Sequence, residues 1–155
     1  MVRIKDLPRF LPLVLVAGVT IAAEQPPYDE KADAHQQIAA AIAEASKAQK
    51  NVILIFGANW CPDCRALDAQ MHKEELAALI ATNYEVVKVD IGQHDKNQDV
   101  GEKYHVPLER GIPALAVLDP GGKLLYAMDQ GQFADARHMS YEGIKEFFVK
   151  WEPKR

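Results

Sequence analysis

The sequence predicts an α/β domain built on a central mixed sheet flanked by helices. The first observation is a continuous apolar run at residues 51–56, which is typical of a strand buried on both faces. The second is a strand pattern at 84–91, separated from the first by a helical pattern, which predicts a right-handed parallel crossover. The third is the turn sequence at 119–122, which predicts an antiparallel hairpin in the same sheet.

The other elements can be placed in order around these strands. Residues 29–50 carry apolar side chains at helical spacing before the first strand. Pro62 suits the first turn of a second helix, because its missing N–H is no loss there, and the apolar stripe of this helix is interrupted near His72. A short helix is expected at 97–104. The expected order of the whole chain is α-β-α-β-α-β-β-α.

The hairpin and a last helix close the chain. The hairpin strands are expected at 114–118 and 124–128. Ser140 is a suitable N-cap for the final helix, where Met139 and Ile144 have the spacing of a hydrophobic staple. One face of this helix is apolar and is expected to be core; it carries Tyr141, Ile144, Phe148 and Trp151.

Composition restricts the class of protein. The 155 residues are 48% hydrophobic and 26% charged, which is typical of a single compact domain and argues against disorder. The net charge of -4 leaves no basic stripe for a phosphate backbone, so nucleic acid is not an expected partner.

The first 23 residues have the pattern of a secretory signal peptide. Arg3, Lys5 and Arg9 precede the apolar run 10–23, which is shorter than a membrane-spanning helix and ends in small residues. Cleavage is expected near Ala22 or Ala23, with an uncleaved anchor as the alternative. The domain itself is then residues 24–155, in a periplasmic or secreted location.

The two cysteines, Cys61 and Cys64, carry the expected chemistry. A separation of three at the start of a helix places Cys61 where unpaired N–H groups and the helix dipole favour a thiolate. The predicted mechanism is attack of the Cys61 thiolate on a substrate disulfide, followed by displacement of the reduced substrate by Cys64, the less exposed resolving thiol. The redox-active group is this cysteine pair itself, and no further cofactor is expected.

The sequence around the cysteines resembles the thioredoxin family. Residues 56–65 (FGANWCPDCR) follow a buried strand as the active site of that family does, and Gly111-Ile112-Pro113 resembles its cis-proline loop. The stretch 71–89 is most similar to secreted thioredoxin-like proteins and to the C-terminal periplasmic domain of the membrane thiol-disulfide interchange protein.

The resemblance implies a role for each site residue. It makes Cys61 the nucleophile, Cys64 the resolving thiol and Trp60 a packing flank, with Pro62 between them at the helix start. It also implies that the Ile112-Pro113 peptide is cis, which would turn the backbone of Ile112 toward the site, where an extended substrate strand can pair with it.

Three departures from the family concern proton transfer and partner choice. Thioredoxins carry a buried carboxylate and a lysine at positions that match Ile55 and Val86 here. Either solvent or a nearby carboxylate relays the proton of Cys64, or exchange is slower than in thioredoxin. The threonine that usually follows the cis proline is Ala114, and residues 107–110 resemble an insertion in the substrate loop. Partner choice is expected to differ accordingly.

The dipeptide between the cysteines is expected to influence the redox potential. Asp63 places a negative charge near the thiolate, whereas Arg65 and the helix dipole favour the thiolate. A solvated helix start is the alternative interpretation of Asp63 and Arg65. A potential nearer thioredoxin than a strong oxidant is expected, although the direction of electron flow is left open.

The expected function is reduction of disulfides in cysteine-containing exported proteins, by a monomer that receives electrons from a membrane thiol reductase. Two alternatives belong to other classes. One is a soft-metal chaperone that binds copper with the cysteines and His72, His94 or His138, although none of these histidines has a tight ligand spacing. The other is a non-catalytic binding module on the same fold.

Overall fold

The computed structural model describes residues 25–154, and the predicted signal peptide at 1–23 lies outside the described residues. The helices are α1 (Ala34–Ala48), α2 (Pro62–Met71), α3 (Glu74–Asn83), α4 (Gln98–Lys103) and α5 (Tyr141–Lys150), and the strands are β1 (Asn51–Gly57), β2 (Tyr84–Asp90), β3 (Ala114–Leu118) and β4 (Leu124–Ala127). Two short 3-10 turns, η1 (Leu108–Arg110) and η2 (Ala136–His138), lie in the connections. Within this range no helix combines the length and the apolar character needed to cross a bilayer.

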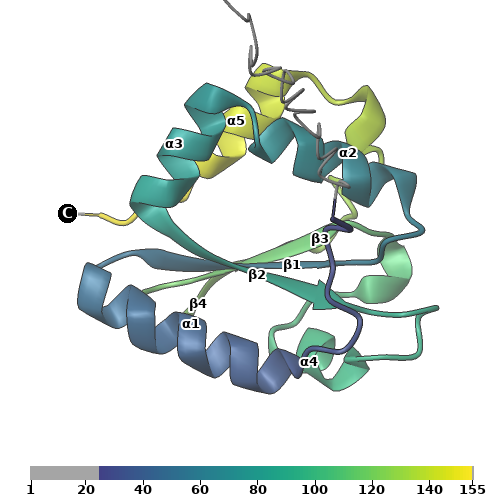
Figure 1. Ribbon diagram of the computed structural model, residues 1–155, viewed down its shortest axis with the longest axis horizontal. Helices are drawn as coiled ribbons and strands as arrows, with labels where there is room; N and C mark the ends of the chain where they lie inside the picture. Colours follow the sequence, from purple (N-terminus) through teal and green to yellow (C-terminus); the bar gives the residue numbers. More distant parts are fainter. Residues whose placement is uncertain (1–24, 155) are drawn as a thin grey trace, which may run out of the picture.

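The strands form one mixed sheet, as the sequence predicts. The strand order is β2-β1-β3-β4, in which β1 runs parallel to β2 and antiparallel to β3. Helices α2, α3 and α5 cover one face of this sheet, and α1 and α4 lie on the other (Figure 1). Strand β1 is buried along its whole length because it is central in the sheet and covered on both faces.

The helix boundaries follow local capping. The first helix begins at Ala34 and not at residue 29, because the Asp33 carboxylate accepts the N–H of Gln36 and ends the preceding turn. The expected interruption near His72 is confirmed, since α2 ends there and α3 begins two residues later. Ser140 caps α5 through the N–H of Gly143, also as predicted.

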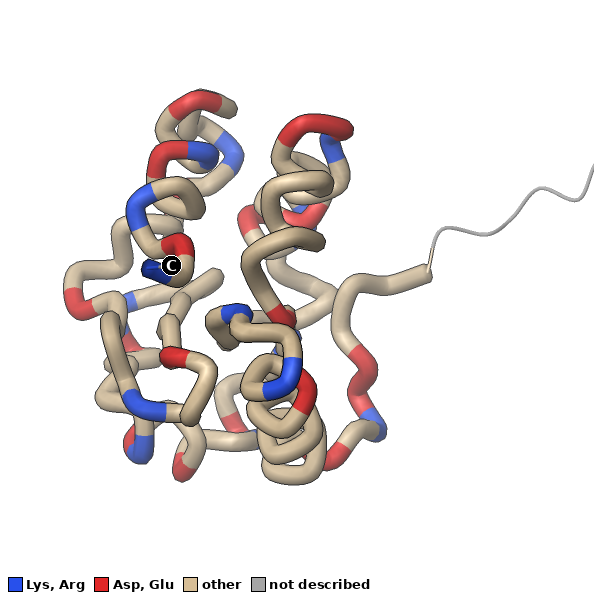
Figure 2. Tube along the Cα trace, turned by 90° about the vertical axis from the view of Figure 1, so that its left-hand side faces the viewer, with Lys and Arg blue, Asp and Glu red and all other residues tan. Residues whose placement is uncertain are grey.

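Charged residues of both signs are mixed on the surface. At the end of the molecule where the chain terminates, acidic and basic positions are interspersed along the helices (Figure 2). This distribution agrees with the small net charge of -4. The opposite end of the sheet, where β1 leads into α2, carries the two cysteines (Figure 1).

Candidate active site

Cys61 is the N-cap of α2, as its position before Pro62 predicts. Its backbone is extended, and its Sγ accepts the N–H of Cys64 at 3.1 Å. A hydrogen bond from the Cys64 thiol lowers the pKa of Cys61 from 9.0 to about 7, helped by backbone N–H groups of Cys64 and Asp63 and opposed by burial. The start of the helix therefore favours a thiolate at neutral pH.

Cys64 has the opposite electrostatic environment. The hydrogen bond that its thiol donates to Cys61, together with burial, raises the pKa of Cys64 well above its usual range. Both cysteines are free thiols, and Cys61 is nearly as enclosed as Cys64, at 3% and 1% exposed. The two sulfurs thus differ much more in acidity than in exposure.

The proline loop lies against Cys61. The Ile112-Pro113 peptide is cis, and the Ile112 carbonyl oxygen is 3.7 Å from Cys61 Sγ. Gly111 precedes this peptide with a φ of 116°, a conformation that glycine adopts without strain. The structure therefore brings the predicted proline loop and the predicted nucleophile together.

Trp60 and Pro62 form the exposed rim beside the thiols. Trp60 is 46% exposed, and its Nε1–H donates to the carbonyl oxygen of Gly92 at 2.8 Å. Its ring also lies 5.8 Å from the His94 ring, centroid to centroid. The tryptophan thus ties the start of α2 to the loop after β2, while Pro62 is open to solvent.

Asp63 is not part of a solvated helix start. It is 8% exposed, and its Oδ1 accepts the backbone N–H and the Nε–H of Arg137. Burial alone would raise the pKa of this carboxyl, but the hydrogen bonds and charge of Arg137 hold it below its usual value. The solvated interpretation is wrong for Asp63 because η2 packs over it, whereas Arg65 is exposed.

A lysine–carboxylate ion pair joins β2 to α2, although it does not occupy the positions of the thioredoxin pair. Ile55 and Val86 hold neither group, but the register of the sheet pairs Ile55 with Lys88, which forms an ion pair with Asp68 of α2. Because Asp68 belongs to a helix and not to a strand, comparing strand positions with those of thioredoxins did not predict this ion pair.

Tyr28 is a site residue that the sequence pattern did not identify. It lies before α1, is 2% exposed, and hydrogen bonds with the Cys64 thiol. Asn59 holds its backbone in place with two hydrogen bonds of 2.9 Å. No local motif marks these contacts, because Tyr28 lies 31 positions before Asn59 and still further before Cys64.

The three histidines of the copper-binding alternative do not form a ligand cluster with the cysteines. His72 contacts Asp68, His138 contacts Asp135, and His94 packs on Trp60. Among residues 25–154 no three His, Cys, Asp or Glu side chains gather in a metal-binding arrangement. These positions give the copper-binding alternative no support.

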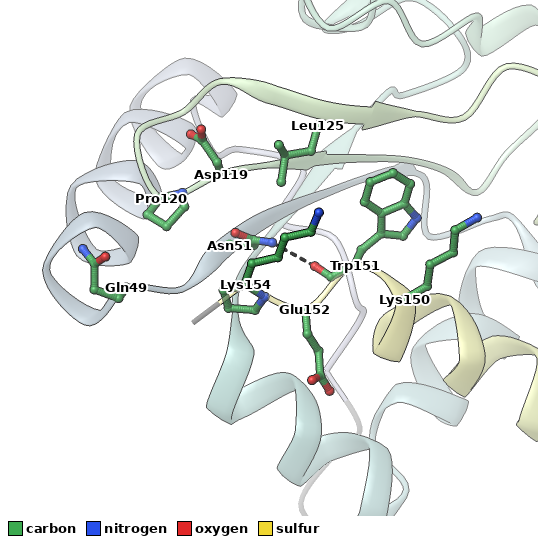
Figure 3. Close-up of a pocket in the computed structure, with 10 residues that line it drawn as sticks. Gln49, Asn51, Asp119, Pro120, Leu125, Lys150, Trp151, Glu152 and Lys154 are labelled. Carbon is green, nitrogen blue, oxygen red and sulfur yellow. Dashed lines mark hydrogen bonds between the residues drawn. The ribbon is translucent and has the colours of Figure 1, made fainter.

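Two cavities of similar size lie at opposite ends of the molecule. One, of about 670 Å³, adjoins the dithiol and is lined in part by Asn59, Pro62 and Arg137. The other, of about 690 Å³, lies near the last residues of the chain. Two residues of its lining are joined by a hydrogen bond, which the Asn51 side chain donates to the Trp151 carbonyl oxygen (Figure 3). Only the first of the two lies beside the start of α2, and neither cysteine is among the residues that line it.

A thioredoxin-type sheet, a cysteine pair at the start of a helix and a cis proline beside the sulfur define a thiol-disulfide oxidoreductase class. A family model described as thioredoxin-like matches residues 33–120, more than half of the chain. The chain belongs to this thioredoxin-like family.

Comparison with solved structures agrees with this assignment. The chain is similar to a disulphide isomerase from Xylella fastidiosa Temecula1, with 45% identity, a TM-score of 0.79, and coverage of 83% of this chain and 98% of that one. It shares the fold of the DsbD C-terminal domain from Neisseria meningitidis, at 18% identity and a TM-score of 0.54, over 78% of this chain and 97% of that one.

One curated relative matches over a shorter region. It is the probable nucleoredoxin 3 of Oryza sativa subsp. japonica, which is 30% identical over 94 residues, or 48% of this chain. The chain spans only 20% of the length of that relative.

Proposed function

We propose that this chain is an exported oxidoreductase that reduces disulfides in cysteine-containing proteins of a bacterial periplasm or an equivalent compartment. The observation that carries the proposal is Cys61 at the N-cap of α2, with its pKa lowered to about 7 by the Cys64 thiol. A thiolate at neutral pH beside the cis-proline loop is poised to attack an extended substrate.

The reaction consists of two displacements. The Cys61 thiolate attacks one sulfur of the substrate disulfide, so a mixed disulfide forms and the other substrate sulfur leaves as a thiolate that takes up a proton. Cys64 then loses its proton and attacks Cys61 Sγ, which forms the Cys61–Cys64 disulfide and releases the second substrate sulfur. The substrate gains two electrons, which the cysteine pair supplies, and two protons. One proton comes from the Cys64 thiol and the other from solvent, because Cys61 reacts as a thiolate.

Export and the source of electrons are parts of the same proposal. The leader pattern at 1–23 supports delivery to an oxidising compartment, where a reduced dithiol must be regenerated after each turnover. We assign that task to a membrane thiol reductase that transfers two electrons to the Cys61–Cys64 disulfide. No group besides the cysteine pair is needed to carry these electrons.

Disulfide isomerisation is a second candidate function. The similarity to the Xylella disulphide isomerase, at 45% identity over nearly all of that chain, favours it. Isomerisation would use the same Cys61 attack, but the mixed disulfide would be resolved by another cysteine of the substrate and not by Cys64. The Cys64→Ser variant therefore separates the two activities.

The test is reduction of insulin by dithiothreitol, followed as precipitation of the freed chains. The wild-type protein should accelerate reduction, and Cys61→Ser should return the rate to background. An unchanged background rate with the wild type would reject oxidoreductase activity. In parallel, refolding of scrambled ribonuclease by Cys64→Ser would support isomerisation, and loss of both activities in this variant would support reduction alone.

A further inference from the structure

We propose that Tyr28 is the hydrogen-bond donor that stabilises the Cys64 thiolate during the resolving step, an inference that rests on the proposed function. Tyr28 lies before the region 33–120 that the family model matches, so the family pattern does not include it. Its side chain is almost completely buried, and its hydroxyl contacts the resolving sulfur. Tyr28 places a hydroxyl beside the dithiol. Ile55, which stands at the strand position of the buried carboxylate in thioredoxins, is apolar.

Gly57 shows how closely the hydroxyl and the sulfur approach the end of β1. A Cβ atom added to Gly57 would lie 2.3 Å from the Tyr28 hydroxyl oxygen and 2.7 Å from Cys64 Sγ. Both distances are too short for any real side chain. The bare Cα of Gly57 therefore admits the hydroxyl and the sulfur to the same space.

Asn59 holds Tyr28 in this position. The backbone N–H of Tyr28 donates to Asn59 Oδ1, and Asn59 Nδ2 donates to the Tyr28 carbonyl oxygen, each at 2.9 Å. The same Nδ2 also donates to the Glu30 carboxylate at 3.0 Å. This clamp connects the segment before α1 to the loop that carries Cys61, so Tyr28 is positioned by the active-site loop itself.

The charges around Cys64 explain why a donor is needed. The hydrogen bond to Cys61 and burial raise the pKa of Cys64, whereas the backbone N–H of Ala58 and the Tyr28 hydroxyl lower it. Burial also raises the pKa of Tyr28 well above its ordinary value, with smaller contributions from the two cysteines and from Asp90 of β2. Tyr28 therefore stays protonated and acts as a donor and not as a base.

Tyr28 neither gains nor loses a proton in the resolving step. Cys64 gives its proton to water or to the substrate thiolate released in the first displacement, and its sulfur then attacks Cys61 Sγ. As charge develops on Cys64, the Tyr28 O–H strengthens its hydrogen bond to that sulfur and keeps its own proton. A hydrogen bond to a charged group stabilises more than a neutral one, so the benefit falls on the charged form.

The test separates the two displacements with dithiobis-nitrobenzoate, an aromatic disulfide. Reduced protein releases one nitrothiobenzoate when Cys61 attacks and a second when Cys64 resolves the mixed disulfide. Tyr28→Phe keeps the ring and removes only the hydroxyl. We expect an unchanged first phase, a second phase slowed by about tenfold, and a pH midpoint of the second phase moved to higher pH.

Two further variants make the result specific. Tyr84→Phe removes another buried hydroxyl, which donates to the Phe148 carbonyl and not to a cysteine, so both phases should keep wild-type rates. Asn59→Ala breaks the clamp and should slow the second phase in the direction of Tyr28→Phe; it carries the same test if Tyr28→Phe does not fold. If the second phase of Tyr28→Phe keeps the wild-type rate and pH midpoint, the role of Tyr28 is overturned and the proposed function is not. A wild-type protein that releases no second equivalent overturns the proposed function as well.

Discussion

Asp63 and Arg137 are bound to each other at the rim of the dithiol. Asp63 Oδ1 accepts the backbone N–H of Arg137 at 3.0 Å and its Nε–H at 3.1 Å, across 74 positions of sequence. Because Asp63 lies between the two cysteines, its charge opposes the Cys61 thiolate. The Arg137 guanidinium carries the opposite charge, so we expect this residue of η2 to limit the effect of Asp63 on Cys61, the N-cap of α2.

Substitutions at the two ends of this ion pair should shift Cys61 in opposite directions. Arg137→Ala leaves the Asp63 carboxylate uncompensated, so the pKa of Cys61 should rise and alkylation by iodoacetamide at pH 7 should slow by about twofold. Asp63→Asn removes the charge that opposes the thiolate but keeps the backbone N–H of residue 63, which lowers the pKa of Cys61. The pKa of Cys61 should therefore fall. Lys47→Ala, which removes an exposed positive charge in the last turn of α1, is the control and should change neither the pKa of Cys61 nor its alkylation rate. Shifts of the same sign in both variants would contradict this assignment.

The Cys64 thiol should account for most of the acidity of Cys61. Its hydrogen bond is the largest cause of the lowered pKa, ahead of the backbone N–H groups. Cys64→Ala should therefore return the pKa of Cys61 toward 9.0, whereas Cys64→Ser retains a donor and should preserve most of the shift. The pH dependence of Cys61 alkylation, monitored by mass spectrometry, measures both variants. Identical profiles for Ala and Ser would show that the backbone of α2 alone lowers the pKa.

The stability of the reduced protein should rise between pH 7 and pH 9. The pKa of Cys61 is about 7 in the folded protein and 9.0 ordinarily, so its stabilisation is present above 9.0 and is lost as the pH falls through 7. Two pH units correspond to at most about 2.7 kcal/mol, which solvent screening reduces to about 1 kcal/mol. Cys64, with a raised pKa, loses stabilisation only above pH 9. Urea unfolding of the reduced wild type and Cys61→Ser should give free energies of unfolding that diverge by this amount, and a constant difference would refute the linkage.

The ion pair between Asp68 and Lys88 should be more sensitive to loss of the acid than of the base. Burial lowers the pKa of the Lys88 ammonium, which shows that its charge is poorly solvated. Asp68→Ala leaves this ammonium without its carboxylate and should lower the free energy of unfolding by about 2 kcal/mol. Lys88→Met removes the charge and keeps the apolar chain, so it should cost less than about 1 kcal/mol. Equal losses in urea unfolding would show that the ion pair is as weak as an exposed one.

The features that local pattern predicted are those set by neighbours along the chain. The helix start at Cys61 and Pro62, the cap at Ser140 and the interruption at His72 each depend on residues within one turn, and all three are confirmed. The cis peptide before Pro113 followed from the family resemblance and is also confirmed. The leader at residues 1–23 stays a prediction.

The features that local pattern missed join distant segments. Tyr28 and Asn59 are 31 residues apart, and Asp63 and Arg137 are 74 apart. Neither pair has a spacing or composition that marks it, because any side chain of suitable length can meet a partner once the elements pack. The solvated interpretation of Asp63 failed for this reason: η2 encloses a position that α2 alone would leave open.

Short-range chemistry thus placed a reactive thiol at the beginning of a helix, because a proline and a resolving cysteine within one turn organise the backbone donors around it. Packing decided how that thiol is tuned. The tyrosine beside Cys64 and the arginine that pairs with Asp63 both come from other parts of the chain. Their effects depend on burial and on distances of a few ångströms, which exist only after the sheet and its covering layers have formed.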